Sequence, residues 1–303
     1  MKRSKMKMRP YSNEEDYDRM RRLLVDIYAL NGPPVYCTVG ELDWWRCLSL
    51  GGNTLAQVQL WLDDEQHVMG YIWPESGATF VLFIHPKHPE LADDMLDWVE
   101  QNGVSFSPVK DDLLEMSISC SSSDRILQRA LEQRGYERGG DYFCFRSRKL
   151  SGSVPSPQLP PGYSIRSMQT DTDLDARVEV HRAAFSPSRM TLEKYRILTG
   201  FPTYRRDLDL VAVAPDGSFA AFAVLWLDEA NRAATFEPVG THPDHRRLGL
   251  GKALLNEGCR RLRDLGVKIA HTQSFGGDFC ATRLYQSAGL VEVDRIYDWK
   301  KSQ

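Results

Sequence analysis

The alternation of hydrophobic and polar residues in the second half of the chain predicts three strands followed by an α-β-α-β succession. Residues 208–214 and 219–227 are apolar segments on either side of Pro215-Asp216-Gly217, a combination that predicts a hairpin. A third strand is expected at 232–241. The other expected elements are a leading helix at 174–185, helices at 249–265 (with Gly266 as C-cap) and 279–287, and strands at 267–274 and 290–300. This order predicts a mixed α/β sheet flanked by helices.

A segment without hydrophobic periodicity divides the chain near its middle. Residues 151–162 contain four prolines, two glycines and three serines, a composition that disfavours helices and central strands. We therefore expect a first domain at 1–150, a linker at 151–162 and a second domain at 163–303.

The two halves repeat one another in outline. Ile84-His-Pro-Lys-His88 is similar to Thr241-His-Pro-Asp-His245, and the segment from Asp124 to Gly135 is similar to the segment from Asp278 to Gly289. Each of these glycines precedes an aromatic-rich segment with a strand pattern. The repeat predicts two domains of one fold.

The strongest chemical signal is Arg246-x-x-Gly249-x-Gly251, which joins the expected strand at 232–241 to the following helix. Glycines allow a close approach of the backbone, and the start of a helix presents free N–H groups and a favourable dipole. A basic, glycine-rich turn of this kind is suited to holding a pyrophosphate.

The spacing around this turn excludes two other phosphate-binding motifs. A P-loop requires Gly-x4-Gly-Lys-Ser/Thr, but Arg246 stands at the first glycine and Ala253 at the hydroxyl position. A dinucleotide fingerprint requires a third glycine where Leu254 stands. The turn instead resembles the acetyl-coenzyme A loop of the GNAT N-acetyltransferase superfamily.

A second segment, from Asp278 to Leu290, resembles the GNAT pattern Asn-x-x-Ala-x-x-Leu-Tyr-x-x-x-Gly-Phe. The resemblance implies that Tyr285 lies near the coenzyme sulfur, where a phenol with a pKa near 10 can protonate a leaving thiolate. The alternative is a tyrosine that only packs in the core. Asp278 departs from the family asparagine, which puts its role in coenzyme binding in doubt. The coenzyme-binding residues implied by the resemblance are Val239, Gly240, Thr241, Arg246, Arg247, Leu248, Gly249, Leu250, Gly251, Lys252, Asp278 and Tyr285.

Glu237 is an acidic residue within an otherwise apolar expected strand. An amine must lose a proton before it can attack a thioester, and a carboxylate can accept that proton directly or through water. The alternation within a strand places Glu237, Val239 and Thr241 on one face. Two alternatives stay open, namely a structural ion pair with an arginine and a water wire without a single base.

The first half lacks these groups. With His85-Pro86 aligned to His242-Pro243, Pro89, Ala92 and Asp94 take the places of Arg246, Gly249 and Gly251. Phe80 and Leu131 take the places of Glu237 and Tyr285. We expect the first half to act as a structural partner or as a wall of the substrate pocket.

Composition narrows the partners. The 303 residues are 42% hydrophobic and 26% charged, with a net charge of −3, which gives no case for nucleic acid or an anionic membrane. No apolar run is long enough to span a membrane. The six cysteines show no Cys-x-x-Cys spacing, which favours reduced thiols in the cytoplasm, and no metal site is expected.

The sequence thus predicts a cytoplasmic tandem GNAT protein of the α/β (α+β) class, with two mixed, mostly antiparallel, splayed sheets. The resemblance implies direct transfer of an acetyl group from acetyl-coenzyme A to a primary amine of a small molecule or peptide. The alternatives are a catalytically silent acyl-coenzyme A sensor and an acyltransferase for another acyl group or for a thiol-pathway amine, as in mycothiol synthase. A monomer and a homodimer are both open. The expected walls of the acceptor pocket are Phe185, Tyr195, Phe201, Tyr204 and Phe275.

Overall fold

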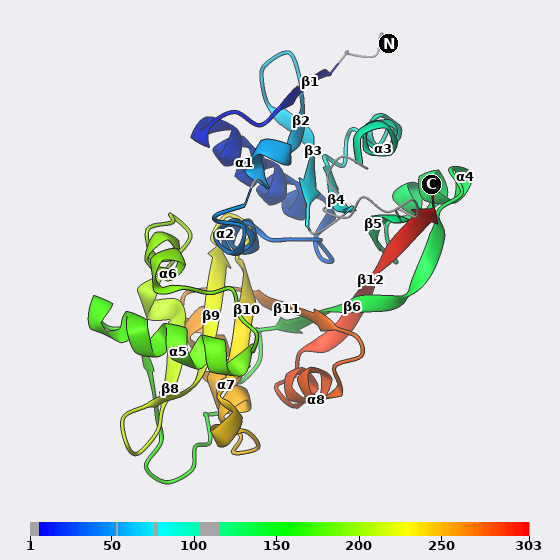
Figure 1. Ribbon diagram of the computed structural model, residues 1–303. Helices are drawn as coiled ribbons and strands as arrows, with labels where there is room; N and C mark the ends of the chain where they lie inside the picture. Colours follow the sequence, from blue (N-terminus) through cyan, green and yellow to red (C-terminus); the bar gives the residue numbers. More distant parts are fainter. Residues whose placement is uncertain (1–5, 53, 76–77, 104–114, 303) are drawn as a thin grey trace.

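The computed structural model describes residues 6–52, 54–75, 78–103 and 115–302, and it contains one continuous twelve-stranded sheet (Figure 1). The strand order is β1-β2-β3-β4-β5-β12-β6-β11-β10-β9-β8-β7. All neighbouring pairs are antiparallel except β4–β5 and β10–β11, which are parallel. This confirms the predicted class of mixed, mostly antiparallel sheets flanked by helices.

The first half, residues 6–150, contributes six strands to the sheet. Its strands are β1 (Lys7–Pro10), β2 (Gln59–Leu62), β3 (Val68–Pro74), β4 (Thr79–Ile84), β5 (Glu115–Ser121) and β6 (Glu137–Lys149). Its helices are α1 (Glu14–Asn31), α2 (Val39–Leu48), η1 (Leu55–Gln57), α3 (Leu91–Asn102) and α4 (Arg125–Gln133).

The second half, residues 163–302, repeats this succession. Its strands are β7 (Ser164–Ser167), β8 (Asp209–Val213), β9 (Phe219–Asp228), β10 (Ala233–Thr241), β11 (Ile269–Phe275) and β12 (Val291–Ser302). Its helices are η3 (Asp171–Asp173), α5 (Leu174–Ala184), α6 (Leu192–Thr199), η4 (Arg206–Leu208), η5 (Pro243–His245), α7 (Leu250–Asp264) and α8 (Phe279–Ser287). The order predicted from the sequence is confirmed, and the prediction lacked only the short strand β7, the short helix α6 and the 3₁₀ turns.

Strand β9 shows why the second half folds as layers. It is apolar over nearly its whole length, and a strand of this kind must be covered on both faces. Helix α7 packs on one face, and α5, together with α2 of the first half, packs on the other. Gly40 of α2 lies so close to Trp226 of β9 that a Cβ would come within 2.2 Å of it. The core therefore continues from one half into the other.

The last strands of the two halves are exchanged. Strand β12 pairs with β5 of the first half, whereas β6 pairs with β11 of the second half, and β6 and β12 pair with each other at the centre (Figure 1). Residues 151–162, which connect the halves, contain no helix or strand, as predicted. The division into two domains at this segment stays a prediction. Strand β6 of the first half pairs with β11 of the second half, and β12 of the second half pairs with β5 of the first half.

The parallel strand pairs diverge. In the second half β10 and β11 pair only from Ala233–Thr235 to Ile269–His271, although both strands continue beyond this point. In the first half β4 and β5 pair only over Thr79–Val81 and Ser117–Ser119. Each half therefore opens a cleft between its two parallel strands, as the sequence predicted for the second half.

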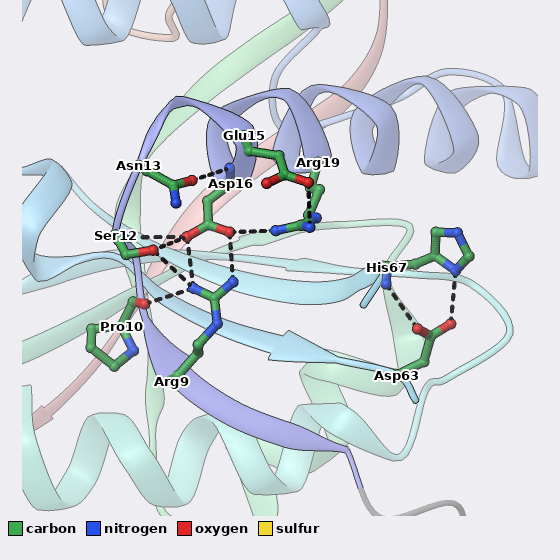
Figure 2. A network of polar contacts seen from close by, with 9 residues as sticks. All are labelled: Arg9, Pro10, Ser12, Asn13, Glu15, Asp16, Arg19, Asp63 and His67. Carbon is green, nitrogen blue, oxygen red and sulfur yellow. Dashed lines mark hydrogen bonds and ion pairs between the residues drawn. The ribbon is translucent and has the colours of Figure 1, made fainter. Parts of the chain in front are cut away.

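Each half also begins with the same kind of ion pair. Arg9 and Asp16 form two hydrogen bonds of 2.6 Å, and the Ser12 backbone N–H donates to the same carboxylate at 3.0 Å (Figure 2). In the second half Arg166 binds Asp173 through two bonds of 2.7 and 2.9 Å. Both pairs are seven residues apart and tie the first strand to the first helical turn.

Candidate active site

A cavity of about 440 Å³ lies where β10 and β11 diverge, and both halves line it. The second half supplies Glu237, Val239 and Tyr285, which the sequence predicted to act together. The other lining residues of the second half are Phe185, Pro238, Gln273, Ser274, Phe275, Asp278, Ala281 and Ile296, and those of the first half are Tyr36, Glu41, Trp45, Glu75, Val81, Ser119 and Phe143.

Glu237 is presented to this cavity by an irregularity in β10. The register with β9 shifts between Phe236 and Val239, and the Trp226 indole donates a hydrogen bond to the Glu237 carbonyl. Burial raises the pKa of Glu237 to about 8, and the charge of Glu41 adds to this rise. A carboxyl group with this pKa can accept a proton near neutral pH. No arginine pairs with Glu237 among the described residues, so the structural alternative considered for it is not supported.

Glu41 and Glu75 come from the first half, and the sequence did not single them out. Glu41 completes a capping box, in which its carboxylate accepts the Thr38 N–H at 2.7 Å. Burial raises the pKa of Glu41 to about 7, and enclosure together with the charge of Asp298 raises the pKa of Glu75 to about 7. The signal for Glu41 was the Thr38-x-x-Glu41 spacing, which indicates a helix cap rather than a cavity wall.

Tyr285 lies on α8 and lines the same cavity as Glu237. Burial raises the pKa of Tyr285 to about 12, although a hydrogen bond from Thr272 and the charge of Arg146 act in the opposite direction. The phenol therefore holds its proton at neutral pH, as a general acid must.

Arg146 is a buried arginine that the first half places behind this wall. It lies on β6, opposite Thr272 of β11, and its guanidinium donates to Ser274 at 2.6 Å and to Thr282 at 2.9 Å. The Cζ atom is 5.8 Å from the centre of the Tyr285 ring. No sequence pattern indicated this residue, because only the strand exchange brings it to the second half.

The turn before α7 has the geometry of an anion cradle. Arg247 and Gly249 have left-handed backbone angles, with φ of 64° and 80°, and no side chain caps the helix. The helix N–H groups are therefore free, and residues 246–249 are exposed. Left-handed residues in such a turn form the concave backbone nests that bind phosphates.

Two further glycines permit close packing beside this turn. A Cβ on Gly251 would lie 3.2 Å from Leu284 of α8. A Cβ on Gly240 would lie 2.5 Å from the Phe222 ring and 2.9 Å from Ala184. Gly249 thus allows the left-handed backbone of the turn. Gly240 allows α5 to approach β10, and Gly251 allows α8 to approach α7.

The backbone of β10 beyond the point of divergence is available to a ligand. The His242 N–H bonds to Ala220 of β9, and bonding alternates along an antiparallel ladder, so Val239 and Thr241 direct their N–H groups away from β9. That side faces the cleft, where β11 no longer pairs. A pantetheine arm has amide groups that such a strand edge can bind.

The other predicted coenzyme residues divide into exposed and buried groups. Arg246 contacts the Thr241 carbonyl at 3.4 Å and the Ala184 carbonyl at 3.3 Å, and Lys252 is exposed on α7. Leu248 is exposed, whereas Leu250 is buried under the helix. Only the backbone of these leucines is therefore available to a phosphate.

Asp278 departs from the family asparagine but has a structural role that either residue can fill. One carboxylate oxygen caps α8 by accepting the Ala281 N–H at 2.9 Å. An aspartate performs this cap as well as an asparagine.

Three predicted pocket walls lie elsewhere. Phe185 and Phe275 line the cavity, but Tyr195 is fully buried, and both Tyr195 and Tyr204 donate hydrogen bonds to Asp209. Phe201 packs against Arg46. These residues belong to the core around α6, an element that the sequence did not predict.

The first half has a cleft of its own without the same groups. A cavity of about 640 Å³ lies between β4 and β5, lined in part by Phe83, His85 and Asp124. Helix α3 begins at Leu91, six residues after His85, whereas α7 begins eight residues after His242. The loop is two residues shorter than the ungapped alignment assumed, so Glu90 and Ala92 take the places of Gly249 and Gly251. Glu90 has an ordinary right-handed backbone and a negative charge, and it cannot form the cradle.

Among residues 6–52, 54–75, 78–103 and 115–302, no helix is long and apolar enough to cross a membrane. The same residues contain no group of three metal-ligating side chains.

Comparison with known proteins identifies relatives of this site. The sequence model of the acetyltransferase (GNAT) family matches residues 174–290. The mycothiol acetyltransferase of Actinosynnema mirum is 31% identical over 148 residues, which cover 47% of this chain and 49% of that protein. That of Salinispora arenicola is 31% identical over 176 residues, covering 55% and 57%. The chain spans about half the length of these curated relatives.

Solved structures are similar over nearly the whole chain. A GCN5-related N-acetyltransferase from Sphaerobacter thermophilus has a TM-score of 0.67 at 20% identity and covers 98% of this chain and 96% of its own. A tandem GNAT protein from the clavulanic acid biosynthesis pathway has a TM-score of 0.64 at 15% identity and covers 98% of both chains. At these identities the likeness establishes the fold, and that fold is a tandem one.

Proposed function

We propose that this chain, whose residues 174–290 belong to the acetyltransferase (GNAT) family, transfers an acetyl group from acetyl-coenzyme A to a primary amine. The observation that carries the proposal is that Glu237 and Tyr285 line one cavity at β10, the strand that precedes the Arg246–Gly251 turn. The turn would hold the pyrophosphate through backbone N–H groups, and the free edge of β10 would bind the pantetheine arm.

The reaction is a direct transfer. The amine nitrogen attacks the thioester carbonyl carbon, the C–N bond forms and the C–S bond breaks. Glu237 accepts a proton from the amine, directly or through water, and Tyr285 gives its proton to the departing sulfur. The products are an amide and a free thiol, and exchange with water restores both side chains.

The charge of the cavity supports an amine as acceptor. Glu41, Glu75 and Glu237 line it, together with Asp278, whereas no lysine or arginine is among its described lining residues. The raised pKa values leave these glutamates partly protonated at pH 7, but an ammonium ion beside them favours their charged forms and is therefore favoured in such a cavity. An acceptor with a carboxylate or phosphate would add a like charge and is disfavoured. Aromatic walls such as Trp45 and Phe143 add favourable contacts for a cation.

The test is the release of free thiol from acetyl-coenzyme A by the full chain. The matched acceptors are n-butylamine, 1,4-diaminobutane and 4-aminobutanoate, which differ only in the second end group. We expect amine-dependent release with the first two and at least tenfold less with 4-aminobutanoate. Binding of acetyl-coenzyme A without any amine-dependent release would support the alternative of a silent sensor.

The relatives favour a second candidate acceptor. Several curated matches are mycothiol acetyltransferases, so the amine that those enzymes acetylate belongs in the same assay. A kcat/KM for that amine at least a hundredfold above the value for n-butylamine would identify a mycothiol-type enzyme. Values within a few-fold of each other would favour a different acceptor.

A further inference from the structure

Arg146 is buried without the partner that a buried arginine normally has. It is 1% exposed, and no carboxylate lies within ion-pairing distance of it among the described residues. Its Nε atom has no hydrogen-bond partner, and its other bonds go to neutral oxygens, namely the hydroxyls of Ser274 and Thr282 and, at 3.5 Å, the Cys144 carbonyl. Burying a charge without an opposite charge is unfavourable.

A second buried arginine has a carboxylate partner, although its two terminal nitrogens form no hydrogen bond. Arg177 is also fully buried, but its Nε donates to the Asp209 carboxylate at 3.1 Å. The charge of Arg177 is therefore paired with a buried carboxylate. Glu292, opposite Arg146 on β12, has its pKa lowered in part by the charge of Arg146, but its carboxylate accepts hydrogen bonds from Cys144 and Arg295 and forms no ion pair with Arg146. A negative charge that exists only during a reaction would account for this difference.

The position of Arg146 indicates which charge that is. Its Cζ atom is 5.8 Å from the centre of the Tyr285 ring, and Ser274, which it binds, lines the same cavity as Tyr285. The other charged groups that act on Tyr285 are Glu237 and Asp278, and both are acidic. Arg146 is the cation among these groups, and its charge lowers the pKa of Tyr285.

The first half provides an internal comparison. Arg146 lies opposite Thr272, one residue beyond the last parallel pair of β10 and β11. The corresponding position on β12 lies opposite Cys120 and is occupied by Tyr297. Leu131 stands where the second half has Tyr285. The half that lacks the phenol also lacks the arginine.

We propose that Arg146 is the positioning residue of the general acid, and that its charge stabilises the phenolate formed when Tyr285 protonates the leaving thiolate. In this step the Tyr285 O–H bond breaks, a proton joins the sulfur, and the negative charge moves from sulfur to the phenolic oxygen. Water then returns a proton to Tyr285. This inference rests on the proposed acetyl transfer, and it makes the first half part of the catalytic apparatus.

The test uses the full chain and measures thiol release both to the best amine of the matched series and to water. Arg146→Met removes the charge and keeps most of the length. We expect a loss of about 100-fold in kcat, similar to the removal of one donor to a developing anion. The Kd for acetyl-coenzyme A should change less than threefold. Arg148→Met is the matched control, because Arg148 lies two residues along β6 but bonds to the Ala288 carbonyl.

A double-mutant cycle separates this role from a structural one. If Arg146 acts through Tyr285, Arg146→Met lowers kcat less than twofold in a Tyr285→Phe background. Arg146→Lys keeps the charge, and it should recover at least tenfold of the loss. An equal loss in both backgrounds, or an unchanged kcat in Arg146→Met, overturns the proposal.

Three outcomes need to be distinguished. If Arg146→Met does not fold, the cycle is run with Arg146→Lys, whose smaller loss should also vanish in the Tyr285→Phe background. If the wild-type chain binds acetyl-coenzyme A but releases no thiol to amines or water, the proposed function itself fails. If the wild-type chain turns over and the cycle is additive, only the role of Arg146 fails.

Discussion

Both halves of the molecule open a cleft where a pair of parallel strands diverges, after Thr235 and His271 in the second half and after Val81 and Ser119 in the first. The cleft of the second half ends at a glycine turn with free N–H groups. The cleft of the first half ends at a shorter turn, with Glu90 before the helix and Asp93 and Asp94 in its first turn.

The difference separates what the fold requires from what the chemistry requires. The shared features are the strand order, the diverging pair and the Arg–Asp ion pair at the start of each half. Among the described residues, the features found only in the second half are the cradle and the two residues proposed as base and acid. The first half instead supplies Glu41, Glu75 and Arg146 to the site of its neighbour.

The largest effect is expected from a substitution that makes the turn before α7 resemble the corresponding turn of the first half. Gly249→Glu reproduces Glu90 and should weaken acetyl-coenzyme A binding more than about 100-fold, because a carboxylate would face the pyrophosphate. Gly249→Ala is the control for strain alone. This variant should weaken the free energy of acetyl-coenzyme A binding by about 1 kcal/mol, since alanine disfavours the φ of 80° that this position has. Calorimetric titration measures both, and equal affinities for the two variants would show that charge at this turn is irrelevant.

The two Arg–Asp pairs allow a comparison of stability. Asp16 is fully buried and accepts hydrogen bonds from Arg9, Ser12 and Arg19, so Asp16→Asn should lower the free energy of unfolding by about 3 kcal/mol. Asp173 is partly exposed, and Asp173→Asn should cost about 1–2 kcal/mol. Urea unfolding at pH 7 measures both values.

The pH dependence checks the same assignment. Arg9, followed by Ser12, holds the pKa of Asp16 well below its usual value. A depressed pKa contributes stability above the unfolded value of about 3.9, and this contribution is lost as the pH falls through the folded value. The difference between wild type and Asp16→Asn should therefore shrink below about pH 4. A difference independent of pH would contradict the ion pair.

Glu41, which the first half contributes to the cavity wall, should affect the pKa of Glu237, the proposed base in the second half. Because the pKa of Glu237 is raised to about 8, it is mostly protonated at pH 7, and the rate should increase with pH around that value. Glu41→Gln removes one cause of the rise, so the midpoint of the kcat/KM profile should move to lower pH. The gain at pH 7 is then at most about tenfold.

The Glu41→Gln variant also keeps the cap of α2, because glutamine is accepted at this position of a capping box. A change in melting temperature is therefore not expected. A profile that stays in place would show that Glu41 does not act on Glu237, whereas a flat profile would exclude Glu237 as the base.

The smallest expected effect concerns the aromatic walls. Phe143 of the first half and Phe275 of the second pack edge to face, with ring centres 6.1 Å apart at the cavity. Phe143→Ala and Phe275→Ala should each raise the KM for the amine about threefold through lost contact area, with no change in acetyl-coenzyme A affinity. Phe201→Ala, outside the cavity, should leave that KM within twofold. If only Phe275→Ala has an effect, the first half does not contact the acceptor.

Local patterns predicted much of the second half. Helix α8 has the predicted bounds, Gly266 ends α7 with a φ of 79°, and Glu237 and Tyr285 share one cavity. These features depend on residues close in sequence. The α6 core around Tyr195 was not predicted, because its eight residues give little periodicity.

The strand exchange could not be read from the sequence. Strands β6 and β12 have a pattern that fits either half, since pairing depends on partners more than a hundred residues away. The predictions that depend on it were therefore missing. Arg146 looks like one more charged residue of a terminal strand, and Glu41 looks like a helix cap.

The exchange also sets the order in which the chain can be completed during synthesis. Strand β12 emerges after every other described strand, yet it fills the place beside β5 in the first half. Until β12 is synthesised, the edge of β5 that it will occupy is unpaired. The edge of β6 is likewise unpaired until β11 is synthesised. A ribosome therefore cannot release a finished first half ahead of the second. The two repeats form a single unit of assembly, so a truncation at the last strand would damage the half encoded first.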